Sequence, residues 1–385
     1  MYWPRTPVER LQYFAPFFCP WPECPDHRRS VRGYRFLRHG TYHTERRTVP
    51  RFRCLSCRRT FSRQSFALSY YLKRPELVVP VAAGLQAGSA HRQLARNLGC
   101  APSTVTRLSA RLGRHALLLM ARALEHLRGG LTEPIVLDHF ETFEFTQDLP
   151  FGIATPVGQD SWFVYGLDPA PHARTGRRSA EQEERRARRP ARLRRGGYEG
   201  SSARTVRLLL SLCPRGRKLE LSGDGHPSYD HAAHLREHAS RVRLQRFPNP
   251  RRGPKGSPRS PEARARDRAM FPVDALHGLI RHTVAHHRRE TIAFGRRLNA
   301  LMERLFLTIV WRNFVKGRSE RRPDPDTPAM RLGLATEPWD WRRTLARRLF
   351  PGRETLPRAW RDLYRRDWVT PVLPCNTRHR LIQAN

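Results

Sequence analysis

Lysine is nearly missing from this chain: it occupies only four of the 385 positions, Lys73, Lys218, Lys255 and Lys316. Acidic residues are also scarce, since 34 Asp and Glu stand against 72 Lys and Arg, which gives a formal net charge of +38 at pH 7. A charge of this sign and size favours a polyanionic partner, and nucleic acid is the common one. The strong bias toward arginine is also expected of a GC-rich genome, so basic composition alone does not identify the partner.

Long hydrophobic runs are missing as well. The longest, 305–311, has the length of a core segment and falls far below the roughly 18 residues that a membrane span needs. No secretory segment is recognisable, so we expect a soluble, cytoplasmic protein with no membrane partner and with reduced cysteines. A hydrophobic content of 39% supports globular folding, in roughly two to four domains, and 32 prolines predict long exposed connections.

Cysteine is scarce too, but four of the seven cysteines form two close pairs, Cys19 with Cys24 and Cys54 with Cys57. This spacing puts four thiolates within reach of one tetrahedral zinc ion, which predicts a zinc-ribbon DNA-binding module over residues 1–70. Two disulfides, or cysteines buried as small apolar residues, are the alternatives. Three further cysteines have no close partner in the sequence and are expected to be packing residues: Cys100, Cys213 and Cys375.

A helix-turn-helix pattern follows over 75–128. Leu77, Val78, Val81 and Leu85 recur at helical spacing, and a short amphipathic helix at 91–98 leads into a tight turn at 99–101. A second helix opens near Pro102. In a helix-turn-helix the N-terminal end of the second helix contacts bases, which predicts a DNA-binding role for Ser103, Thr104, Thr106 and Arg107. An ordinary helical hairpin is the alternative.

From residue 131 onward the pattern becomes strand-like. Apolar and alternating residues predict one strand over 135–138, continued over 140–145, and a second over 161–167. Further along we expect a basic helix or disordered arm at 172–203, a helix at 206–212, a strand at 218–221, a flexible loop at 247–268 and helices over 273–316. A tail, 317–385, is rich in Pro and Trp and carries short helices. The chain is therefore predicted to be multidomain α+β.

Three aspartates stand out against the positive charge. Asp138 ends the first predicted strand, Asp224 follows a later strand at a Gly-rich turn, and Asp274 opens a predicted helix. Three carboxylates gathered in one cleft could hold two divalent metal ions, about 3.5–4 Å apart, for attack on a phosphodiester. Magnesium suits oxygen ligands of this kind. The alternative is that these aspartates form turns and cap helices, with Asp274 as a helix cap.

The order of these parts resembles the bacterial insertion-sequence transposases of the DDE type, and in particular the family around insertion sequence one. The run 135–138 with 161–165 looks like that family's first pair of catalytic strands. Asp224-Gly225 followed by Pro227 and Tyr229 is similar to its second-acid motif, and 281–294 resembles the end of its third-acid helix. The resemblance covers roughly residues 15–316 and implies that 131–316 is an RNase H-like α/β catalytic domain with a mixed sheet, with 172–203 as a basic insert.

In that family the third acid lies seven residues before a basic residue, which puts it at Asp274 with Arg281 as its partner. Seven residues are two helical turns, so both would share a face, with Arg281 on a DNA phosphate and the acid on metal. Family members usually carry Glu here, so Asp274 is a departure, and Glu290 is a second possibility for the third acid.

The resemblance implies a transposase that binds the terminal inverted repeats of its own element and cuts and joins strands with Mg²⁺ or Mn²⁺. Its partners would be double-stranded DNA and further copies of itself, and its location the bacterial cytoplasm in association with the nucleoid. Asp274 favours an alternative, an inactive, transposase-derived regulator that keeps DNA binding. A third reading is a structure-selective nuclease or an RNA-binding protein.

Overall fold

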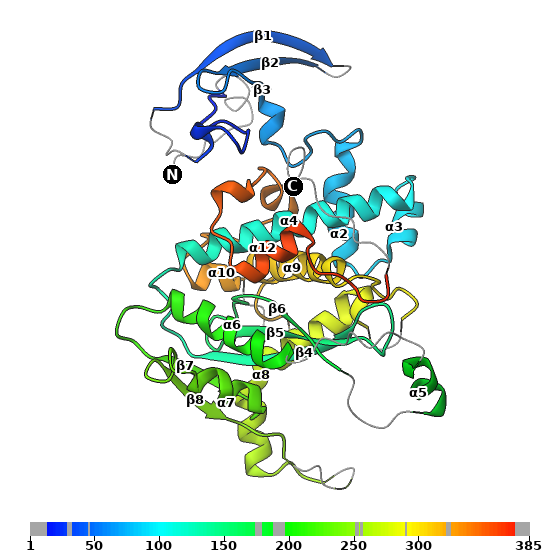
Figure 1. The fold of residues 1–385 in the computed structure, drawn as a ribbon, viewed down its shortest axis with the longest axis vertical. Helices are drawn as coiled ribbons and strands as arrows, with labels where there is room; N and C mark the ends of the chain where they lie inside the picture. The colour runs from blue at the N-terminus through cyan, green and yellow to red at the C-terminus, as the bar shows by residue number, and fades with distance from the viewer. Residues whose placement is uncertain are drawn as a thin grey trace.

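The computed structural model describes residues 14–28, 33–44, 47–173, 179–187, 197–250, 254, 257–288, 291–320 and 325–373. Two hydrophobic clusters organise it: a small one around the paired cysteines and a large one that joins the helices to a sheet. Figure 1 shows the cysteine module at one end of the molecule, a layer of long helices below it, and the sheet with its own helices at the other end.

The cysteine module is a three-stranded antiparallel sheet in the order β1-β2-β3. Its strands are β1 (Phe36–Thr44), β2 (Arg47–Cys54) and β3 (Thr60–Ser62), flanked by the 3₁₀ turns η1 (Pro25–His27) and η2 (Arg63–Phe66). Along β1 only Phe36 and Tyr42 are even half-buried, so most of this strand is exposed on both faces. The buried cluster consists of Cys19, Cys24, Phe52, Cys54 and Phe61. A core this small needs a cross-link or a metal ion to be stable.

The helical layer begins with η3 (Pro75–Leu77), α2 (Val78–Gln86) and α3 (His91–Asn97), followed by the long helix α4 (Pro102–His126). The predicted helical stripe is confirmed, because Leu77, Val78, Val81 and Leu85 are all buried. A tight turn separates α3 from α4, with Gly99 at a φ of +56°, a conformation that glycine adopts without strain. Beyond its exposed N-terminal turns, α4 is buried and packs along α9 (Leu298–Phe314).

The large sheet has five strands in the order β6-β5-β4-β7-β8. They are β4 (Ile135–Phe143), β5 (Pro150–Gly158), β6 (Asp168–Pro171), β7 (Leu219–Gly223) and β8 (Val242–Arg246). The first three pair antiparallel, while β7 runs parallel to both β4 and β8. The protein is therefore α+β with a mixed sheet, as the sequence predicts.

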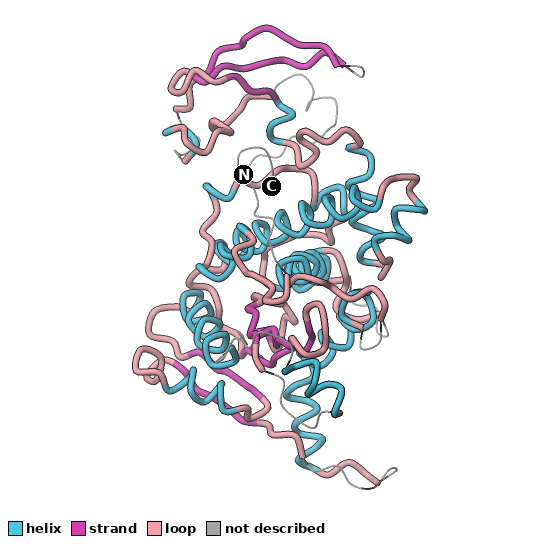
Figure 2. Tube along the Cα trace, turned by 45° about the vertical axis from the view of Figure 1, so that its right-hand side comes forward, coloured by secondary structure: helices cyan, strands magenta, loops and turns pink. Residues whose placement is uncertain are grey.

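Helices cover both faces of this sheet. On one face lie α6 (Gly197–Leu212), which packs on β5 and β6, and α7 (Pro227–His234), which packs on β8. On the other face lies α8 (Pro261–Thr283), against β4, β5 and β7, and η4 (Ala285–His287) follows it. A separate helix, α5 (Ala180–Ala187), stands away from the body within the basic segment. Figure 2 shows the same division from a second direction.

The strand predicted at 161–167 is wrong. The strand that pairs with β4 is β5, although it contains Pro150, Pro156 and two glycines. The segment 161–167 instead folds back along the end of β5 through one isolated bridge, Val157 with Val164. Its aromatic and β-branched residues suit a strand, but here they are buried in irregular structure, so tertiary packing overrides local propensity.

The loop predicted at 247–268 is also too long, because α8 begins at Pro261. Ser260 caps the helix by accepting a hydrogen bond from the amide of Ala263, and Pro261 occupies the first turn. Asp274 therefore lies well inside α8 rather than at its start, which rules out the helix-capping alternative. Helix α6 likewise starts at Gly197, earlier than the predicted helix at 206.

The tail connects the two hydrophobic clusters. It carries α10 (Pro328–Arg331), α11 (Trp341–Thr344), η5 (Pro351–Arg353) and α12 (Arg358–Arg365), which confirms the predicted short helices. Trp360 of α12 is buried in the large core. Phe350, just before η5, packs its ring against Phe18 and Phe66 of the cysteine module. The tail thus ties the module to the body.

Within the described part of the chain, no helix combines the length and the apolar character that crossing a membrane requires.

Candidate metal centre and carboxylate site

The four paired cysteines converge. The Sγ atoms of Cys19 and Cys57 lie 3.7 Å apart, as do those of Cys24 and Cys54, and all four lie within 4.8 Å of one another. Four thiolates around zinc, with Zn–S bonds of about 2.3 Å, have S–S separations of about 3.8 Å. The cysteines are free rather than disulfide-bonded. The cluster is thus compatible with a zinc ribbon, and its four thiols could bind one zinc ion.

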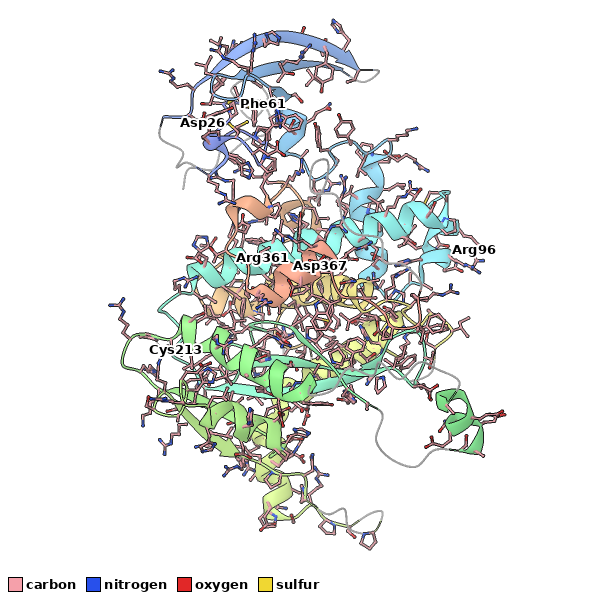
Figure 3. All side chains as sticks on the ribbon, in the orientation of Figure 1. Asp26, Phe61, Arg96, Cys213, Arg361 and Asp367 are labelled. Carbon is pink, nitrogen blue, oxygen red and sulfur yellow. The ribbon has the colours of Figure 1, made fainter. Side chains whose placement is uncertain are left out.

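The surroundings of the cluster fit a cation. Burial and the neighbouring thiols raise the pKa of Cys19, and burial raises the pKa of Cys24 to about 11, so without a cation these thiols resist ionisation. Asp26, which is buried, lies near both Cys54 and Ser56. Figure 3 shows the sulfur atoms gathered near Asp26 and Phe61, with Cys213 far away in the body. Cys100 and Cys213 lie outside the cluster, and Cys375 lies outside the described residues.

Two of the predicted acids are brought side by side by the sheet. In the parallel pair β4–β7, Ile135 is opposite Leu221 and Val136 is opposite Ser222. Two residues further along the same strands are Asp138, inside β4, and Asp224, directly after β7. Because both strands run in the same direction, these two carboxylates leave the sheet at the same level.

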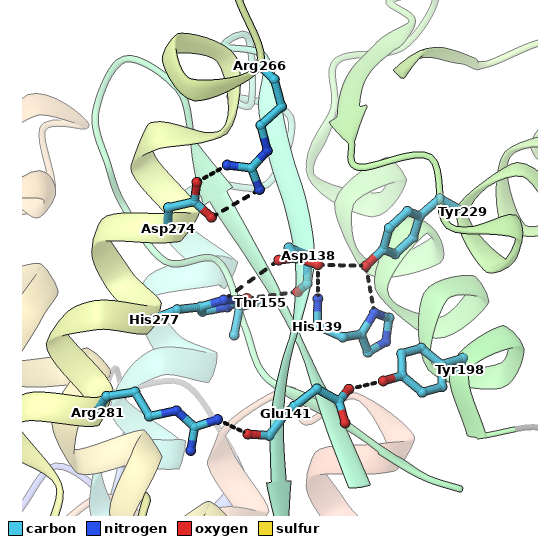
Figure 4. A network of polar contacts seen from close by, with 10 residues as sticks. All are labelled: Asp138, His139, Glu141, Thr155, Tyr198, Tyr229, Arg266, Asp274, His277 and Arg281. Carbon is cyan, nitrogen blue, oxygen red and sulfur yellow. Dashed lines mark hydrogen bonds and ion pairs between the residues drawn. The ribbon is translucent and has the colours of Figure 1, made fainter. Parts of the chain in front are cut away.

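Side chains from both faces of the sheet approach Asp138 (Figure 4). On the α8 side, Nδ1 of His277 lies 3.7 Å from its Oδ2, and Nε2 of His277 lies 2.7 Å from the Thr155 hydroxyl. Burial lowers the pKa of His277 to about 3, so its contact with Asp138 is made by a neutral imidazole and is no ion pair. On the α7 side, the Tyr229 hydroxyl donates to Oδ1 of Asp138 over 3.3 Å and lies 2.8 Å from Nδ1 of His139.

The pKa of Asp138 depends on the charges of the other two aspartates. Burial, followed by the negative charge of Asp224 and, more weakly, that of Asp274, raises the pKa of Asp138 to about 7. Opposing shifts come from the His139 amide and the Tyr229 hydroxyl, which hydrogen-bond to the carboxylate. Asp224, after β7, and Asp274, on α8, thus both act electrostatically on Asp138 of β4.

Asp274 is engaged by another residue of its own helix. Arg266, two turns earlier on α8, forms an ion pair with its carboxylate, and the second guanidinium nitrogen lies 3.4 Å from Oδ1. Among the described residues, only the four cysteines bring three or more potential ligand groups within 4.8 Å of one another. Asp138, Asp224 and Asp274 are thus neighbours that do not converge on one point while Arg266 holds Asp274.

Arg281 lies two turns beyond Asp274 on α8 and contacts the protein itself. Its guanidinium donates to the carbonyl of Glu141 and, over 2.5 Å, to that of His287, and it sits 4.2 Å above the Phe140 ring. The arginine therefore clamps α8 to β4. Its contact with a DNA phosphate stays a prediction, and Glu290, the second possibility for the third acid, lies outside the described residues.

A histidine and tyrosine cluster that sequence reasoning missed lies on the other face of β4. Tyr198 of α6 packs against His139, His172 and His226, with ring centroids 4.5–4.9 Å apart, and its hydroxyl donates to Glu141. Partial desolvation and the negative charge of Asp138 raise the pKa of Glu141, whose side chain stays half exposed. The sequence signal was available for part of this site: alternation along β4 sends 139 and 141 to one face and 138 and 140 to the other.

The predicted DNA-contacting residues lie at the surface end of α4. Ser103, Thr106 and Arg107 are exposed and Thr104 is half-buried, while the next turns enter the core. The Thr106 hydroxyl donates to the Pro102 carbonyl and lies 3.1 Å from Nδ1 of His91 on α3, which fixes the two helices relative to each other. Their arrangement agrees with a helix-turn-helix, and their contact with bases stays a prediction.

No protein-family model matches this sequence, and no curated protein and no solved structure matches it significantly.

Proposed function

We propose that the protein is a DNA transposase that binds the ends of its own element and cuts and joins DNA strands with Mg²⁺ or Mn²⁺. The observation that carries the proposal is the meeting of Asp138 and Asp224 on adjacent parallel strands, with Asp274 close enough on α8 to influence the Asp138 charge. In this proposal the mixed sheet and its helices form the RNase H-like catalytic domain that the resemblance implies. Acids on two strands and one helix are what the proposed chemistry requires.

The residues at this site fit a divalent cation. Asp138 is a largely buried carboxylate under repulsion from two others, and a cation would remove that repulsion. Asp138 and Asp224 would hold the metal, and bound metal ions would supply an activated oxygen nucleophile and stabilise the leaving oxygen. Thr155 holds the backbone of Asp138 by donating to its carbonyl, His277 lies beside the carboxylate on the α8 side, and Tyr229 orients the carboxylate from α7.

Asp274 would join this site only after leaving Arg266. Both residues lie on α8, so the ion pair between them can break through a change of side-chain rotamer. A DNA phosphate arriving beside Arg266 would compete with Asp274 for the guanidinium and release the carboxylate toward Asp138. In this proposal the third acid is therefore made available by the substrate.

The distribution of charge supports a nucleic-acid partner. Glu45 is the only acidic residue between Asp26 and Glu76, a span that is rich in arginine and includes the ribbon of β1 and β2, of which β1 is mostly exposed. A two-stranded ribbon or a helix fits the major groove of DNA, so β1–β2 and the N-terminal end of α4 are the two elements suited to reading the element ends. Cutting two ends in one complex implies a dimer or larger assembly on DNA.

Strand cleavage and joining on a labelled duplex of the element end, with Mg²⁺, tests the proposal. Asp138→Ala and Asp224→Ala should each abolish the products, and Asp274→Ala should reduce them strongly. Asp230→Ala is the matched control, since Asp230 also lies on a helix beside the sheet, is similarly exposed, and pairs with an arginine other than Arg266. Products that persist in both the Asp138 and Asp224 variants would refute the proposed active site.

DNA recognition has its own test. Arg107→Ala should weaken binding and reduce the slope of log affinity against log salt by about one, because one phosphate contact is lost. Arg128→Ala, which removes an exposed arginine just beyond the other end of α4, should leave both unchanged. Equal effects of the two variants would argue against recognition by the start of α4.

A second candidate function is a DNA-binding regulator without catalysis. The ion pair of Asp274 with Arg266 favours it, because a shorter acid held by an arginine is poorly placed to bind metal. Asp274→Glu discriminates between the two: higher cleavage activity would indicate an intact but weakened site. Tight, specific binding with no products from either form would support the regulator.

A further inference from the structure

A groove of about 990 Å³ lies between the cysteine module and the segment that leads into α2. One wall comes from β1–β3 and η2, and the other from residues 67–75. Tyrosines, hydroxyl-bearing residues and two basic residues line it, and none of the described residues that line it is acidic. This groove is remote from the carboxylate site and belongs to neither the zinc cluster nor the start of α4.

The charges around the groove are suited to phosphate. Arg51 reaches it from β2 and Lys73 from the opposite wall. Two acids are adjacent in the chain to lining residues: Glu76 is paired with Arg74 over 2.9 Å, and Glu45 lies outside the described residues. A concave surface with basic residues on both sides and no acid attracts a polyanion and raises its local concentration.

Aromatic rings supply the second recognition element. Tyr70 and Tyr71 meet edge to face with ring centroids 4.5 Å apart, and Tyr71 keeps 71% of its surface exposed. Tyr42, on the facing wall, donates from its hydroxyl to Oε1 of Gln64 over 3.1 Å. An exposed ring beside basic residues is the arrangement on which unpaired bases stack in single-strand binding proteins.

The backbone that carries the exposed ring has a fixed and unusual conformation. Tyr71 has a φ of +61°, a left-handed conformation that is unusual for a residue with a bulky side chain. Arg111 of α4 maintains it by donating to the carbonyls of Leu68 and Tyr70 over 2.8 and 2.7 Å. Arg348 of the tail lies 5.4 Å from the Tyr70 ring centroid. Helix α4 and the tail thus fix the backbone on either side of a strained, solvent-facing tyrosine, and such strain persists where the surrounding structure enforces it.

We propose that this groove holds an unpaired segment of DNA, with a base stacked on Tyr71 and its phosphates facing Arg51 and Lys73. Stacking requires the face of a base, and a duplex hides those faces except at its end, so a single strand fits the groove and a continuous duplex does not. The inference deepens the proposed function, since DNA that is being cut and joined contains single-stranded tails. It does not depend on catalysis, because the groove shares no residue with the aspartate site.

The test compares binding of the full chain to a blunt duplex and to the same duplex with a single-stranded tail of about ten nucleotides. The wild type should prefer the tailed duplex. Tyr71→Ala should weaken binding of the tailed duplex by roughly 5- to 150-fold, the range for loss of one stacked base, with little change for the blunt one. Tyr71→Phe keeps the ring and should keep the preference.

Phe17→Ala is the matched control, because Phe17 is another exposed aromatic residue of the cysteine module and does not line the groove. A 2-aminopurine in the tail should lose fluorescence on binding to the wild type and to Tyr71→Phe, and should keep it with Tyr71→Ala. Equal affinity of the wild type for tailed and blunt duplexes, or equal effects of Tyr71→Ala and Phe17→Ala, would overturn the inference. So would a Tyr71→Ala variant that changes only the oligomeric state, since that result would make the groove a protein interface.

Asp138→Ala separates this inference from the proposed function. A protein that prefers tailed DNA through Tyr71, yet yields no strand transfer in any form, would retain the groove assignment and reject the transposase. Strand transfer that depends on Asp138, in a protein that binds tailed and blunt duplexes equally well, would retain the transposase and reject the groove assignment.

Discussion

Asp138 is the residue at which the two faces of the sheet meet. Its carboxylate is approached by His277 from α8 and by Tyr229 from α7, while its own carbonyl accepts a hydrogen bond from the Thr155 hydroxyl over 2.8 Å. Gly223 makes the Tyr229 contact possible, because a Cβ at this position would lie 2.9 Å from the tyrosine ring. The absence of a side chain at Gly223 thus leaves room for the tyrosine that orients the Asp138 carboxylate.

The raised pKa of Asp138 predicts a pH-dependent effect of Asp138→Asn. Because the folded protein holds this proton up to a pKa of about 7, the stability it contributes is present below the ordinary aspartate range and is lost as the pH rises through 7. Asparagine cannot ionise. The free energy of unfolding of the variant, relative to that of the wild type, should therefore rise by roughly 1–3 kcal/mol between pH 5 and 8.5.

Urea unfolding in buffer without added Mg²⁺ measures this difference. Adding Mg²⁺ at pH 8.5 should narrow it, since the metal would bind the wild-type carboxylate. A difference that stays constant across the pH range would show that Asp138 is not the group that titrates.

The cysteine quartet predicts one zinc ion per chain. Cys54→Ser should lose that ion and loosen the small core that Cys54 shares with Phe52 and Phe61, because structural zinc supplies much of the folding energy of such modules. Cys213→Ser, a buried cysteine outside the quartet, should keep the metal. Elemental analysis of the purified proteins gives the answer, and a wild type free of zinc would exclude the ribbon.

At the scale of residues, spacing in the sequence is sufficient to predict the cysteine quartet, since short pairs must bring their thiols together. It also predicts that Asp224 follows a strand, whereas Asp138, predicted to end a strand, lies inside β4 because that strand continues to Phe143. The ion pair between Arg266 and Asp274 is not predictable in the same way. Arg266 and Asp274 share a face of α8 only because the helix begins at Pro261, earlier than the composition of the segment indicates.

Among the elements, α4 and α9 lie in close contact. Gly113 of α4 lies against Glu303 of α9, and a Cβ on Gly113 would lie only 2.4 Å from the Glu303 carbonyl oxygen. Glu303 is buried and pairs with Arg114 of α4 and Arg366 of the tail. The two helices can therefore separate only by breaking a buried ion network.

This packing predicts opposite effects of two glycine substitutions. Gly113→Ala should lower the free energy of unfolding by roughly 1–3 kcal/mol, because the added methyl forces α4 and α9 apart. Gly278→Ala, on the exposed face of α8 with open space around it, should raise it by up to about 1 kcal/mol through helix propensity. Thermal and denaturant unfolding of both variants measures this, and similar effects of the two would contradict the packing described.

Elements with strong local signals are predicted well from the sequence, and those set by tertiary contacts are not. The strand β4 and the helix α4 follow from their apolar periodicity. The strand β5 was missed because Pro150, Pro156 and two glycines give it little strand propensity, whereas its two neighbouring strands hold it in place. The start of α8 is predictable from the sequence, since Ser260, Pro261 and Glu262 form a recognisable helix beginning.

At the scale of the whole molecule, the tail determines how the cysteine module sits on the body. The Phe350 ring centroid lies 5.2 Å from that of Phe18 and 5.7 Å from that of His27, and the Arg348 amide donates to the Phe66 carbonyl over 2.9 Å. The groove beside Tyr71 lies along the same junction. Anything that loosens the tail should therefore loosen both the module and the groove.

Phe350→Ala tests the role of the tail. It should expose the segment between module and body, so that trypsin cleaves after Lys73 roughly 10-fold faster, because opening of the junction becomes easier. Phe271→Ala, which removes an exposed ring on α8, should leave this cleavage rate unchanged. Limited proteolysis followed by mass spectrometry identifies the cut sites, and an unchanged rate in Phe350→Ala would mean that the tail does not hold the module.

The central claim is that Asp138 and Asp224 hold the metal ions of a strand-transfer site, and a change of metal preference tests it most directly. In Asp224→Cys a soft thiolate replaces a hard carboxylate, and Mn²⁺ accepts such a ligand more readily than Mg²⁺. We predict that strand cleavage by this variant is lost in Mg²⁺ and partly restored in Mn²⁺, while Asp230→Cys, on the neighbouring helix, behaves like the wild type in both. Cleavage by Asp224→Cys that equals the wild type in Mg²⁺ would contradict the claim.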